Sequence, residues 1–482
     1  MNSLRMRHRL LLGLAAAGLV WTAGCSSGDD GSLGPRSALS VVRPASASKV
    51  LSHIVVIIQE NRSFENFFAG YPGANAPTSG CAIPVTSSGS GSIRSRGIRP
   101  LGSRANPQSS SSCPPGDISV ALKETTLDGP DLEHNWHSSR VSWNKGKMDG
   151  FSRFGKAGKY QAYEYVNPED IAPYWDMAEQ YVLADAMFPT EFGGSFTAHL
   201  TLVAGNDNIR QSPSRAEVDF PDGKYDDCDS PPGTRSSYLT ANDLEHDERG
   251  PFPCFGQWDT IANVLDEAGI SWKYYASKLL DAGFWEPFEA MKYTRYGPDW
   301  TRSIIAPQTQ VLEDAADGNL ASVTFVSPSK PDSDHPHDGD AGPSWVASVV
   351  NAIGESSYWD TSAIVILWDD YGGWYDNAMP PKLDYRGLGI RVPCLIVSPY
   401  AKQGYVSHVQ YEYGSVLKFI EEVFRLNSIG PSSEGYTDSR AATLDDAFDF
   451  NQAPRAFTLV RPKYPRSHFL HEPPSNEPVD TQ

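Results

Sequence analysis

The chain has 482 residues, of which 40% are hydrophobic and 11% aromatic, a length and composition that allow one large α/β domain with insertions. The formal net charge is −19, which excludes nucleic acid as the expected partner because phosphate backbones are bound by basic surfaces. The same charge disfavours electrostatic docking on an anionic membrane. An anionic ligand would therefore need local positive charge, most simply from a metal ion.

The first 25 residues have the layout of an export signal. Arg5, Arg7 and Arg9 precede an apolar run over residues 10–17 that is too short to span a bilayer. Residues 23–25, Ala-Gly-Cys, are similar to a bacterial lipoprotein box in which Cys25 is acylated, although Thr22 stands where Leu is usual. We expect an exported protein, either lipid-anchored to the cell envelope or periplasmic or secreted, with residues 26–49 as a flexible tether.

The six cysteines divide into three groups. Cys25 belongs to the export segment, and Cys394 lies in a predicted strand. An exported protein can oxidise the other four, which allow three connectivities. Pairing neighbours is the simplest choice, and free thiols remain an alternative; the neighbour pairs are Cys81–Cys113 and Cys228–Cys254.

A run of five β-branched residues, 54–58, ends abruptly at a polar cluster, residues 59–63. Such a run is typical of a strand buried on both faces of a parallel sheet. Ligands bind beyond the carboxyl ends of these strands, and Glu60 and Asn61 offer oxygen atoms that suit a divalent cation. The alternative is a helix N-terminus that Asn61 or Ser63 caps.

A second polar cluster precedes a predicted helix in the middle of the chain. After a Ser-, Gly-, Pro- and Arg-rich insertion at about 74–116, the segment 174–205 predicts helix, strand and helix. Two glycines expose the hydroxyl of Ser195 where backbone N–H groups can meet a phosphate. His199 follows one helical turn later and can face the same pocket. Ser195 can also cap the helix.

The C-terminal half alternates between helical and strand patterns. Strands are predicted at 270–275, 322–327, 362–367 and within 387–400, with helices at 260–269 and 415–426. Polar clusters follow two of these strands, at His335 and at Asp369 and Asp370. The alternation predicts an α/β fold with a mainly parallel central sheet between helices. We expect one catalytic domain over residues 50–457 and a Pro-rich tail over 458–482.

The ordered motifs resemble a bacterial phosphoesterase family, that of the phospholipases C and the respiratory-burst-inhibiting acid phosphatases. Residues 53–70 are similar to its opening H-x-V-V-x-x-x-Q-E-N-R-S-F, and further matches occur at 131–151, 193–199, 335–340 and 369–381. The resemblance covers about residues 50–457 and implies an alkaline phosphatase/sulfatase-like core. Asn377 departs from the family's usual His, which puts a metal or acid role at that position in doubt.

The resemblance implies metal-dependent hydrolysis of a small-molecule or phospholipid phosphoester, as phospholipase C or acid phosphatase. It implies Ser195 as the nucleophile and His134 and His335 as catalytic histidines. One divalent cation is expected on Glu60, Asn61, Asp369, Asp370 and Ser195. We expect His199 and Asn377 at the substrate. An all-oxygen shell favours Ca²⁺, Mg²⁺ or Mn²⁺ over Zn²⁺ without fixing the metal.

Three alternatives concern function. Aromatic residues near the motifs either line a choline cage by cation–π contact or simply pack in the core; they are Trp136, Trp368, Tyr371 and Trp374. A lipid-anchored, non-catalytic binding protein on a degenerate hydrolase core is the main rival, and Asn377 supports it. A serine esterase of the Gly-x-Ser-x-Gly class is disfavoured, because Ser195 lies in Gly-Gly-Ser-Phe-Thr.

Overall fold

The computed structural model describes residues 46–85, 113–154, 160–209, 215–219, 228–231, 233–242, 244–251, 254–257, 259–279 and 285–471. The chain divides into two units, residues 1–43 and 44–482, and all described residues belong to the second. The predicted export segment with Cys25, and most of the predicted tether, lie outside the described residues. Among the described helices, none is long and apolar enough to cross a membrane.

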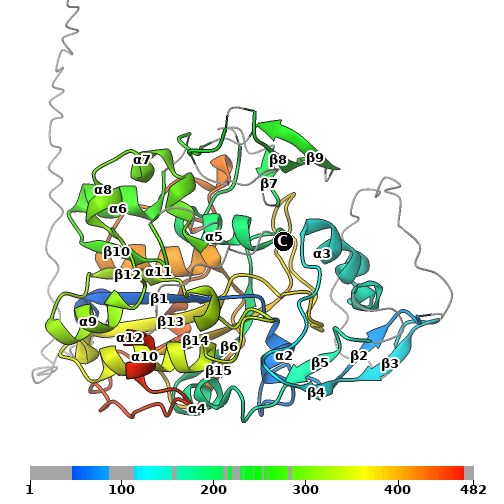
Figure 1. The fold of residues 1–482 in the computed structure, drawn as a ribbon, viewed down its shortest axis with the longest axis horizontal. Coiled ribbons are helices and arrows are strands. Elements are labelled where there is room, and N and C mark those ends of the chain that lie inside the picture. Colours follow the sequence, from blue (N-terminus) through cyan, green and yellow to red (C-terminus); the bar gives the residue numbers. More distant parts are fainter. Residues whose placement is uncertain are drawn as a thin grey trace, which may run out of the picture. The chain divides into compact units, whose positions relative to one another are not determined.

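The described residues form a nine-stranded central sheet, which runs through the middle of Figure 1. Its strand order is β11-β10-β12-β1-β13-β14-β6-β15, and β16 also pairs with β6. The strands are β1 (His53–Gln59), β6 (Val182–Phe188), β10 (Trp272–Tyr275), β11 (Ile304–Ile305), β12 (Val323–Val326), β13 (Ser362–Trp368), β14 (Val392–Val397), β15 (Tyr405–Ser407) and β16 (Tyr411–Glu412).

The sheet is mainly parallel, as predicted, with β14 as the exception. The pairings of β1 with β12 and β13, and of β6 with β15 and β16, are parallel. Strand β14 runs antiparallel to both neighbours, β13 and β6. The connection from β13 to β14, residues 369–391, contains no helix, and antiparallel neighbours need no helical crossover. The predicted α/β fold class is therefore confirmed, with one reversed strand.

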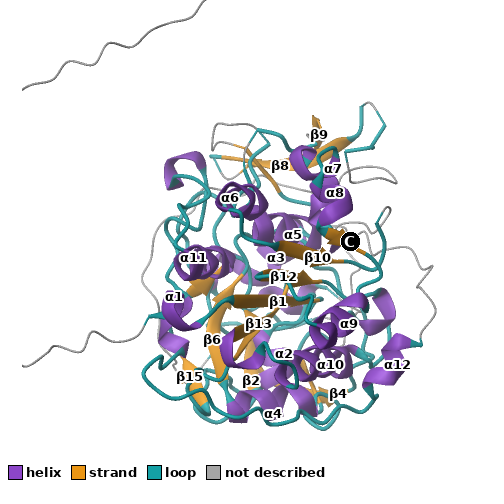
Figure 2. Cartoon of the chain, turned by 90° about the vertical axis from the view of Figure 1, so that its left-hand side faces the viewer, coloured by secondary structure: helices purple, strands orange, loops and turns teal. Residues whose placement is uncertain are grey.

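Helices cover both faces of the sheet (Figures 1 and 2). One face carries α5 (Ser195–Ala204), α6 (Ile261–Ala268) and α11 (Tyr413–Phe424), and the other carries α4 (Ala172–Gln180), α10 (Gly342–Gly354) and α12 (Arg466–Leu470). The run 54–58 in β1 is fully buried, as expected for a strand covered on both faces. The remaining α-helices are α1 (Ala47–Val50), α2 (Phe64–Phe68), α3 (Trp136–Trp143), α7 (Lys292–Arg295), α8 (Asp299–Arg302) and α9 (Gln310–Asp317).

Smaller sheets and two disulfides organise the insertions. Strand β2 (Ser79–Ala82) pairs with β3 (Ile118–Ala121), β4 (Lys123–Thr125) with β5 (Glu164–Val166), and β7 (Arg215–Glu217) with β8 (Arg235–Thr240), which also pairs with β9 (Leu244–Pro251). The neighbour pairing of cysteines is confirmed by the disulfides Cys81–Cys113 and Cys228–Cys254. Cys394 is a buried free thiol in β14.

The capping alternative at the first polar cluster holds for Ser63. Its side chain accepts a hydrogen bond from the backbone N–H of Asn66 at 3.1 Å and so caps α2. It also donates to the carbonyl of Tyr375 at 2.7 Å. Asn61 is not the cap; its backbone is left-handed, with φ +62°. The Asn61 side chain therefore remains available for the site described below.

The folded region extends beyond residue 457. Val460 and Phe469 are 0% and 1% exposed, although both fall within the predicted Pro-rich tail. The side chain of Asn351 in α10 bonds to both backbone groups of Val460, and Phe469 packs on Trp345. Apolar anchors thus hold residues 458–471 on the core, while 472–482 lie outside the described residues.

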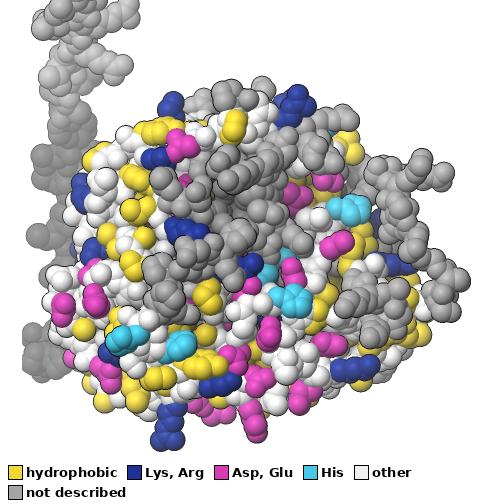
Figure 3. Space-filling model, in the orientation of Figure 1, with side chains coloured by type: hydrophobic (Ala, Val, Ile, Leu, Met, Phe, Trp, Pro, Cys, Tyr) yellow, Lys and Arg dark blue, Asp and Glu magenta, His cyan; other side chains and the backbone are white. Residues whose placement is uncertain are grey.

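The surface is chemically mixed where it can be seen. On the face in Figure 3, the Lys and Arg side chains that are drawn lie singly among acidic, apolar and uncharged ones. This visible face therefore does not present its described basic residues as one continuous patch.

Candidate active site

Four strands bring the polar clusters to one edge of the central sheet. Strands β1, β12 and β13 are parallel neighbours, and β6 points the same way because the reversed strand β14 separates it from β13. The segments that follow these four strands carry Glu60 and Asn61, His335, Asp369 and Asp370, and Ser195. Sequence separations of up to 308 residues are thereby reduced to hydrogen-bond distances.

Glu60, His199 and Asp369 form a group that can hold a metal ion. One possible ligand atom from each lies within 4.8 Å of the others, and all three residues are fully buried. His199 Nε2 is 3.1 Å from Oε1 of Glu60. Burial lowers the pKa of His199 to about 4, which keeps the imidazole in the neutral form that binds metals.

His199 therefore differs from the role expected for it. We expected this histidine at the substrate, and its position beside Glu60 and Asp369 makes it a candidate metal ligand. The sequence signal was its place one turn after Ser195, which predicted the shared pocket but not the partner. With His199 as a ligand the shell would not be all oxygen, and the reason for disfavouring Zn²⁺ would no longer apply.

Asn61 links the carboxylates to both catalytic-histidine candidates. Its backbone N–H donates to Oδ1 of Asp369 at 2.8 Å. One terminal atom of its amide lies 3.1 Å from Nε2 of His134 and 3.0 Å from Nε2 of His335, and the other lies 3.2 Å from both carboxylate oxygens of Asp369. When the Asn61 amide nitrogen faces the two histidine rings, its oxygen lies beside the carboxylate of Asp369. One cation could then bind both the amide oxygen and the carboxylate. With the amide reversed, its nitrogen donates to Asp369.

The two histidines are oriented through their Nδ1 atoms. His134 donates from Nδ1 to the carbonyl of Leu132 at 2.6 Å. His335 donates from Nδ1 to the carbonyl of Pro336 at 2.8 Å, and Oδ2 of Asp338 lies 3.0 Å from the same nitrogen without hydrogen-bond geometry. In a neutral ring each Nε2 is then an acceptor for the Asn61 amide, and in a protonated ring it is a donor. The sequence predicted both histidines at the polar cluster, and in the structure both rings face the side-chain amide of Asn61.

The acidic neighbours of His335 differ in their contacts. Of the three aspartates expected around it, Asp338 contacts the ring. Asp332 accepts from Ser329 and Gln308, while Asp334 accepts from Tyr174 at 2.7 Å and from Trp368 at 3.0 Å; the ring environment is thus less acidic than the sequence suggested.

Ser195 is the first residue of α5 and its hydroxyl is directed at the cluster. It donates to Oδ2 of Asp370 at 2.9 Å and lies 3.3 Å from Oδ1 of Asn61. Gly194, not Ser195, is the N-cap, so the capping alternative is wrong for this serine. Gly193 is required because an added Cβ would lie 2.1 Å from Oγ1 of Thr197.

The segment after β13 presents Asp370 to Ser195. Burial and the adjacent Asp369 raise the pKa of Asp370 to about 7. The backbone N–H of Gly372 donates to Oδ1 of Asp370 at 2.7 Å. Gly372 has φ +60°, and an added Cβ would lie 2.0 Å from the carbonyl oxygen of Asn61, so glycine is required there. Tyr413, which sequence reasoning missed and for which no motif stood out, donates to the carbonyls of Trp368 and Asp369.

The residues fit a divalent cation. Glu60, Asp369 and Asp370 are at most 1% exposed, and their oxygens gather around Asn61, His199 and Ser195. Buried like charges repel strongly at low dielectric, and a bound cation offsets that repulsion. The donor set, mostly carboxylate and amide oxygen with one imidazole, suits a first-row or alkaline-earth cation.

Asn377 lies outside this group. Its side chain donates to Oδ1 of Asn75 at 3.0 Å and accepts from Arg391 at 3.1 Å. Arg391 in turn pairs with the buried carboxylate of Asp376 and covers the ring of Phe64 at 4.3 Å. The hydrogen bonds of Asn377 therefore belong to a packed charge cluster.

The four aromatic residues considered for a choline cage are at most 3% exposed. Trp374 has the guanidinium of Arg62 over its ring at 5.6 Å, and Trp136 has that of Arg140 at 5.3 Å. Trp368 is packed between Phe67 and Tyr174. Packing, rather than a cage, accounts for these residues.

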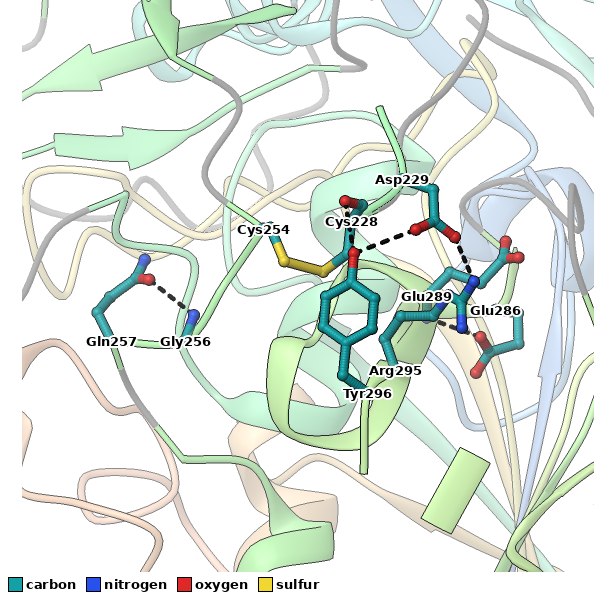
Figure 4. The surroundings of a disulfide bond; sticks show 9 residues. All are labelled: Cys228, Asp229, Cys254, Gly256, Gln257, Glu286, Glu289, Arg295 and Tyr296. Atoms are coloured by element: carbon teal, nitrogen blue, oxygen red, sulfur yellow. Dashed lines mark hydrogen bonds and ion pairs between the residues drawn. A yellow bond between two sulfur atoms is a disulfide. The ribbon is translucent and has the colours of Figure 1, made fainter. Parts of the chain in front are cut away.

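The disulfide Cys228–Cys254 lies next to the segment that packs near His335. Sequence reasoning did not place this disulfide near the site. The ring of Trp285 lies 6.2 Å from that of His335, and a short 3-10 turn, Pro287–Ala290, follows it. The backbone N–H of Cys228 donates to the carbonyl of Glu289 at 3.0 Å. Figure 4 shows Cys228–Cys254 beside this turn, with Asp229 bonded to Arg295 and Tyr296.

Relatives with known names share most of this chain. It is 25% identical to a non-hemolytic phospholipase C of Pseudomonas aeruginosa, over 90% of this chain and 62% of that protein, so it spans less than two thirds of that relative. It is 24% identical to phospholipase C A of Mycobacterium tuberculosis, over 84% of this chain and 78% of the other. A non-specific phospholipase C4 of Arabidopsis thaliana is 23% identical, over 80% and 70%.

Solved structures and a family model complete the comparison. The chain is similar to murine ectonucleotide pyrophosphatase/phosphodiesterase 5, with a TM-score of 0.35 and 9% identity over 58% of this chain and 94% of the other. It is also similar to an alkaline phosphatase superfamily protein from Vibrio parahaemolyticus, with a TM-score of 0.33 and 11% identity over 54% and 62%. The family model covers residues 51–427, well over half of the chain, which therefore belongs to the Phosphoesterase family.

Proposed function

We propose that this protein hydrolyses phospholipids as a metal-dependent phospholipase C, with Ser195 as the nucleophile. The observation that carries the proposal is the hydrogen bond from Ser195 to Asp370 at 2.9 Å, in a fully buried cluster that can hold a metal. A hydroxyl at a helix N-terminus that makes no capping bond is free to react. Membership of the Phosphoesterase family supports the reaction class.

The proposed metal ligands are Glu60, Asn61, Asp369, Asp370, Ser195 and His199. A divalent cation bound there would neutralise phosphoryl oxygens and favour ionisation of the Ser195 hydroxyl. Asp370, whose Oδ2 accepts the hydrogen bond of the Ser195 hydroxyl at 2.9 Å, is placed to accept the hydroxyl proton. Ser195 Oγ then forms a bond to phosphorus while the bond to the alcohol oxygen breaks. Water then releases the head-group phosphomonoester, phosphocholine for phosphatidylcholine, from the phosphodiester on Ser195 and restores the hydroxyl in a second displacement.

His335 is the proposed acid for the leaving alcohol. Oδ2 of Asp338 lies 3.0 Å from its Nδ1, a negative charge that favours the protonated ring. Its Nε2 faces the Asn61 amide, and because Asn61 presents its nitrogen to the rings when its oxygen binds the metal, Nε2 carries a proton only once the leaving-group oxygen has replaced that contact. His134 is bound at Nδ1 by a neutral carbonyl and is 4.0 Å from Asp131. We propose that His134 holds phosphate oxygens. His335 donates its Nε2 proton to the departing alkoxide.

The substrate class rests on the relatives. Three proteins that the chain resembles are named phospholipases C, which supports a phospholipid as substrate. The acid phosphatase type, which shares the same phosphoryl chemistry, is the second candidate. A non-catalytic binding protein is disfavoured because the cluster around Ser195 is complete in spite of Asn377. No part of the proposal involves nucleic acid.

The test compares three substrates with purified protein. Phosphatidylcholine in mixed micelles, a nitrophenyl phosphomonoester and a nitrophenyl phosphodiester are incubated with wild type and with Ser195→Ala, and products are followed by ³¹P NMR. Release of phosphocholine from the lipid by wild type alone supports the phospholipase. Turnover of the monoester alone assigns the acid phosphatase type. No turnover by wild type after addition of Ca²⁺, Mg²⁺, Mn²⁺ or Zn²⁺ would leave the binding protein.

Export is proposed together with this function. The two disulfides support it, because such bonds persist in oxidising compartments. Acylation of Cys25 would place the enzyme on a membrane, and plain secretion would release it. Fractionation of cells that express wild type or Cys25→Ser distinguishes these routes: a shift from membrane to soluble fractions supports the anchor.

A further inference from the structure

A second group of buried carboxylates lies beside the turn that carries Ser195. Glu191 belongs to that turn, Asp207 follows α5, and Glu217 ends β7. These residues are 3%, 0% and 0% exposed, respectively. None of them belongs to the candidate active site. The group therefore needs its own physical explanation.

The oxygens of this group are not satisfied by hydrogen bonds. Within the described part of the chain, no donor meets hydrogen-bond geometry at either carboxylate oxygen of Glu191, at Oδ2 of Asp207 or at Oε1 of Glu217, although the side chains of Asp207 and Thr197 lie close enough to Glu191 to act on its pKa. A buried acceptor without a partner is unfavourable. Both oxygens of Glu191 lack one, so its whole carboxylate is taken out of water without a donor in hydrogen-bond geometry.

Oxygens from three segments converge next to Gly193. A Cβ added to this glycine would lie 2.1 Å from Oγ1 of Thr197, 2.5 Å from Oε1 of Glu191 and 2.6 Å from the carbonyl oxygen of Val218. Oxygens gathered in this way repel one another unless a proton or a cation lies between them. Asp207 is close enough to contribute to the raised pKa of Glu191, for which burial is the larger cause.

The surrounding cations do not balance the charge. Arg386 pairs with Asp207 at 2.5 Å and with Asp384 at 2.7 Å. Arg440 pairs with Asp384 and with Glu412. Among the described residues, these two guanidinium groups thus face three carboxylates before Glu191 and Glu217 are counted. Glu191 and Glu217 therefore need protons or a cation beyond these two groups.

We propose that this group is a second metal site, which binds Ca²⁺ through the carboxylates of Glu191 and Asp207. The hydroxyl of Thr197 and the carbonyl of Val218 complete the set of neighbouring oxygens. Ca²⁺ accepts carboxylate, hydroxyl and carbonyl oxygens in flexible geometry, and no nitrogen ligand is present among these four residues. The ion would tie the turn before Ser195 to the segments that follow α5, and so hold the nucleophile in position.

The experiment measures bound calcium, not activity. In an Asp369→Asn background, which removes the candidate active-site metal, calcium per chain is determined after equilibrium dialysis, and the melting temperature is recorded with and without calcium. One calcium per chain and a calcium-dependent rise in melting temperature are expected. Adding Glu191→Gln should abolish both. The matched control is Glu421→Gln, which alters another buried carboxyl, one that accepts a hydrogen bond from Ile429 and should leave both unchanged.

The contrary results are equally clear. No calcium in the Asp369→Asn protein, or equal calcium with and without Glu191→Gln, would overturn the site and assign a shared proton to Glu191 and Asp207. Should Glu191→Gln not fold, Thr197→Val replaces a neutral ligand with an isosteric apolar group. It is expected to raise the Kd for calcium about tenfold or more, and an unchanged Kd would also overturn the site.

Discussion

Oγ of Ser195 lies 2.9 Å from Oδ2 of Asp370, although 175 residues separate them in the chain. Ser195 follows β6 and Asp370 follows β13, two strands that are not neighbours in the sheet. They meet because β14 lies antiparallel between them and leaves both pointing the same way. This relationship is the geometric basis of the predictions below.

Replacing Ser195 by Ala should abolish phosphoester hydrolysis. The hydroxyl is the proposed nucleophile, and loss of a catalytic serine lowers kcat on the order of 10⁴–10⁶-fold. Ser63→Ala is the control: it removes the cap of α2 and should cost about 1–2 kcal/mol of stability while activity remains. Turnover by Ser195→Ala close to that of wild type would show that another group attacks phosphorus.

Glu60→Gln and Asp369→Asn should each strip the cation. Both residues belong to the three-residue metal group, and a ligand at 100 times its Kd stabilises the folded state by about 2.7 kcal/mol. Metal content after dialysis and the melting temperature should therefore fall together. Asp338→Asn, which alters a carboxylate bound to His335, should keep the metal. Full occupancy in both ligand variants would mean that the ligands are other residues.

His335→Ala and His134→Ala should differ in their dependence on the leaving group. A nitrophenolate leaves without protonation, whereas an alkoxide needs an acid, whose contribution is typically about 10²–10⁴-fold. His335→Ala should therefore lose roughly that much more activity on an alkyl phosphoester than on a nitrophenyl ester. His134→Ala should lose similar activity on both. Equal losses for His335→Ala on the two substrates would remove its acid role.

Asp334→Asn should change how stability depends on pH. Burial raises the pKa of Asp334 to about 7, above its ordinary 3.8. A raised folded pKa means that its contribution to stability is complete below about pH 3.8 and is lost as pH rises through 7. Wild type should therefore lose stability relative to Asp334→Asn over this range, by at most about 1.4 kcal/mol per pH unit. Urea unfolding at several pH values measures it.

Asp340→Asn provides the opposite sign. Burial alone would raise the pKa of Asp340, yet hydrogen bonds from Lys463 and Tyr464 lower it. Its contribution to stability is present above pH 3.8 and is lost as pH falls below that value. A pH dependence of the same sign for both variants would contradict the assignment of Asp334.

Removing the disulfide Cys228–Cys254 with a double Ser variant should lower both stability and activity. The cross-link spans 26 residues, for which the chain-entropy account gives about 3 kcal/mol. Activity should fall as well, because Cys228 is bonded to the turn beside Trp285 and His335. Removing Cys81–Cys113, which spans 32 residues, should lower stability by a similar amount and leave kcat unchanged. Equal losses of kcat in the two variants would show that the disulfide Cys228–Cys254 has no specific effect on the active site.

The sequence by itself determined the longer strands of the central sheet, the ends of α6 and the positions of the polar clusters, whereas the short strands β11, β15 and β16 and the small sheets were not predicted. The five β-branched residues of β1 are enough to predict a strand buried on both faces, because no exposed strand favours such a run. Thr260, Asn263 and Gly269 likewise specify α6 locally, through a capping box and a left-handed glycine with φ +69°. These signals depend on neighbours in the chain and so can be read without the fold.

Only the tertiary structure decided which partners each side chain has. The reversed strand β14 has an apolar sequence like that of β13 and β6, the two strands to which it runs antiparallel, and strand direction leaves no mark in such a run. The contact of His199 with Glu60 joins residues 139 apart, and the hydrogen bond of Asn377 to Asn75 joins residues 302 apart. The core packing of Trp368 and Trp374 likewise depends on distant segments. These contacts form between segments that are distant in the chain. A side chain's hydrogen-bond partners and burial depend on which segments pack around it in the fold, and its neighbours in the chain do not specify them.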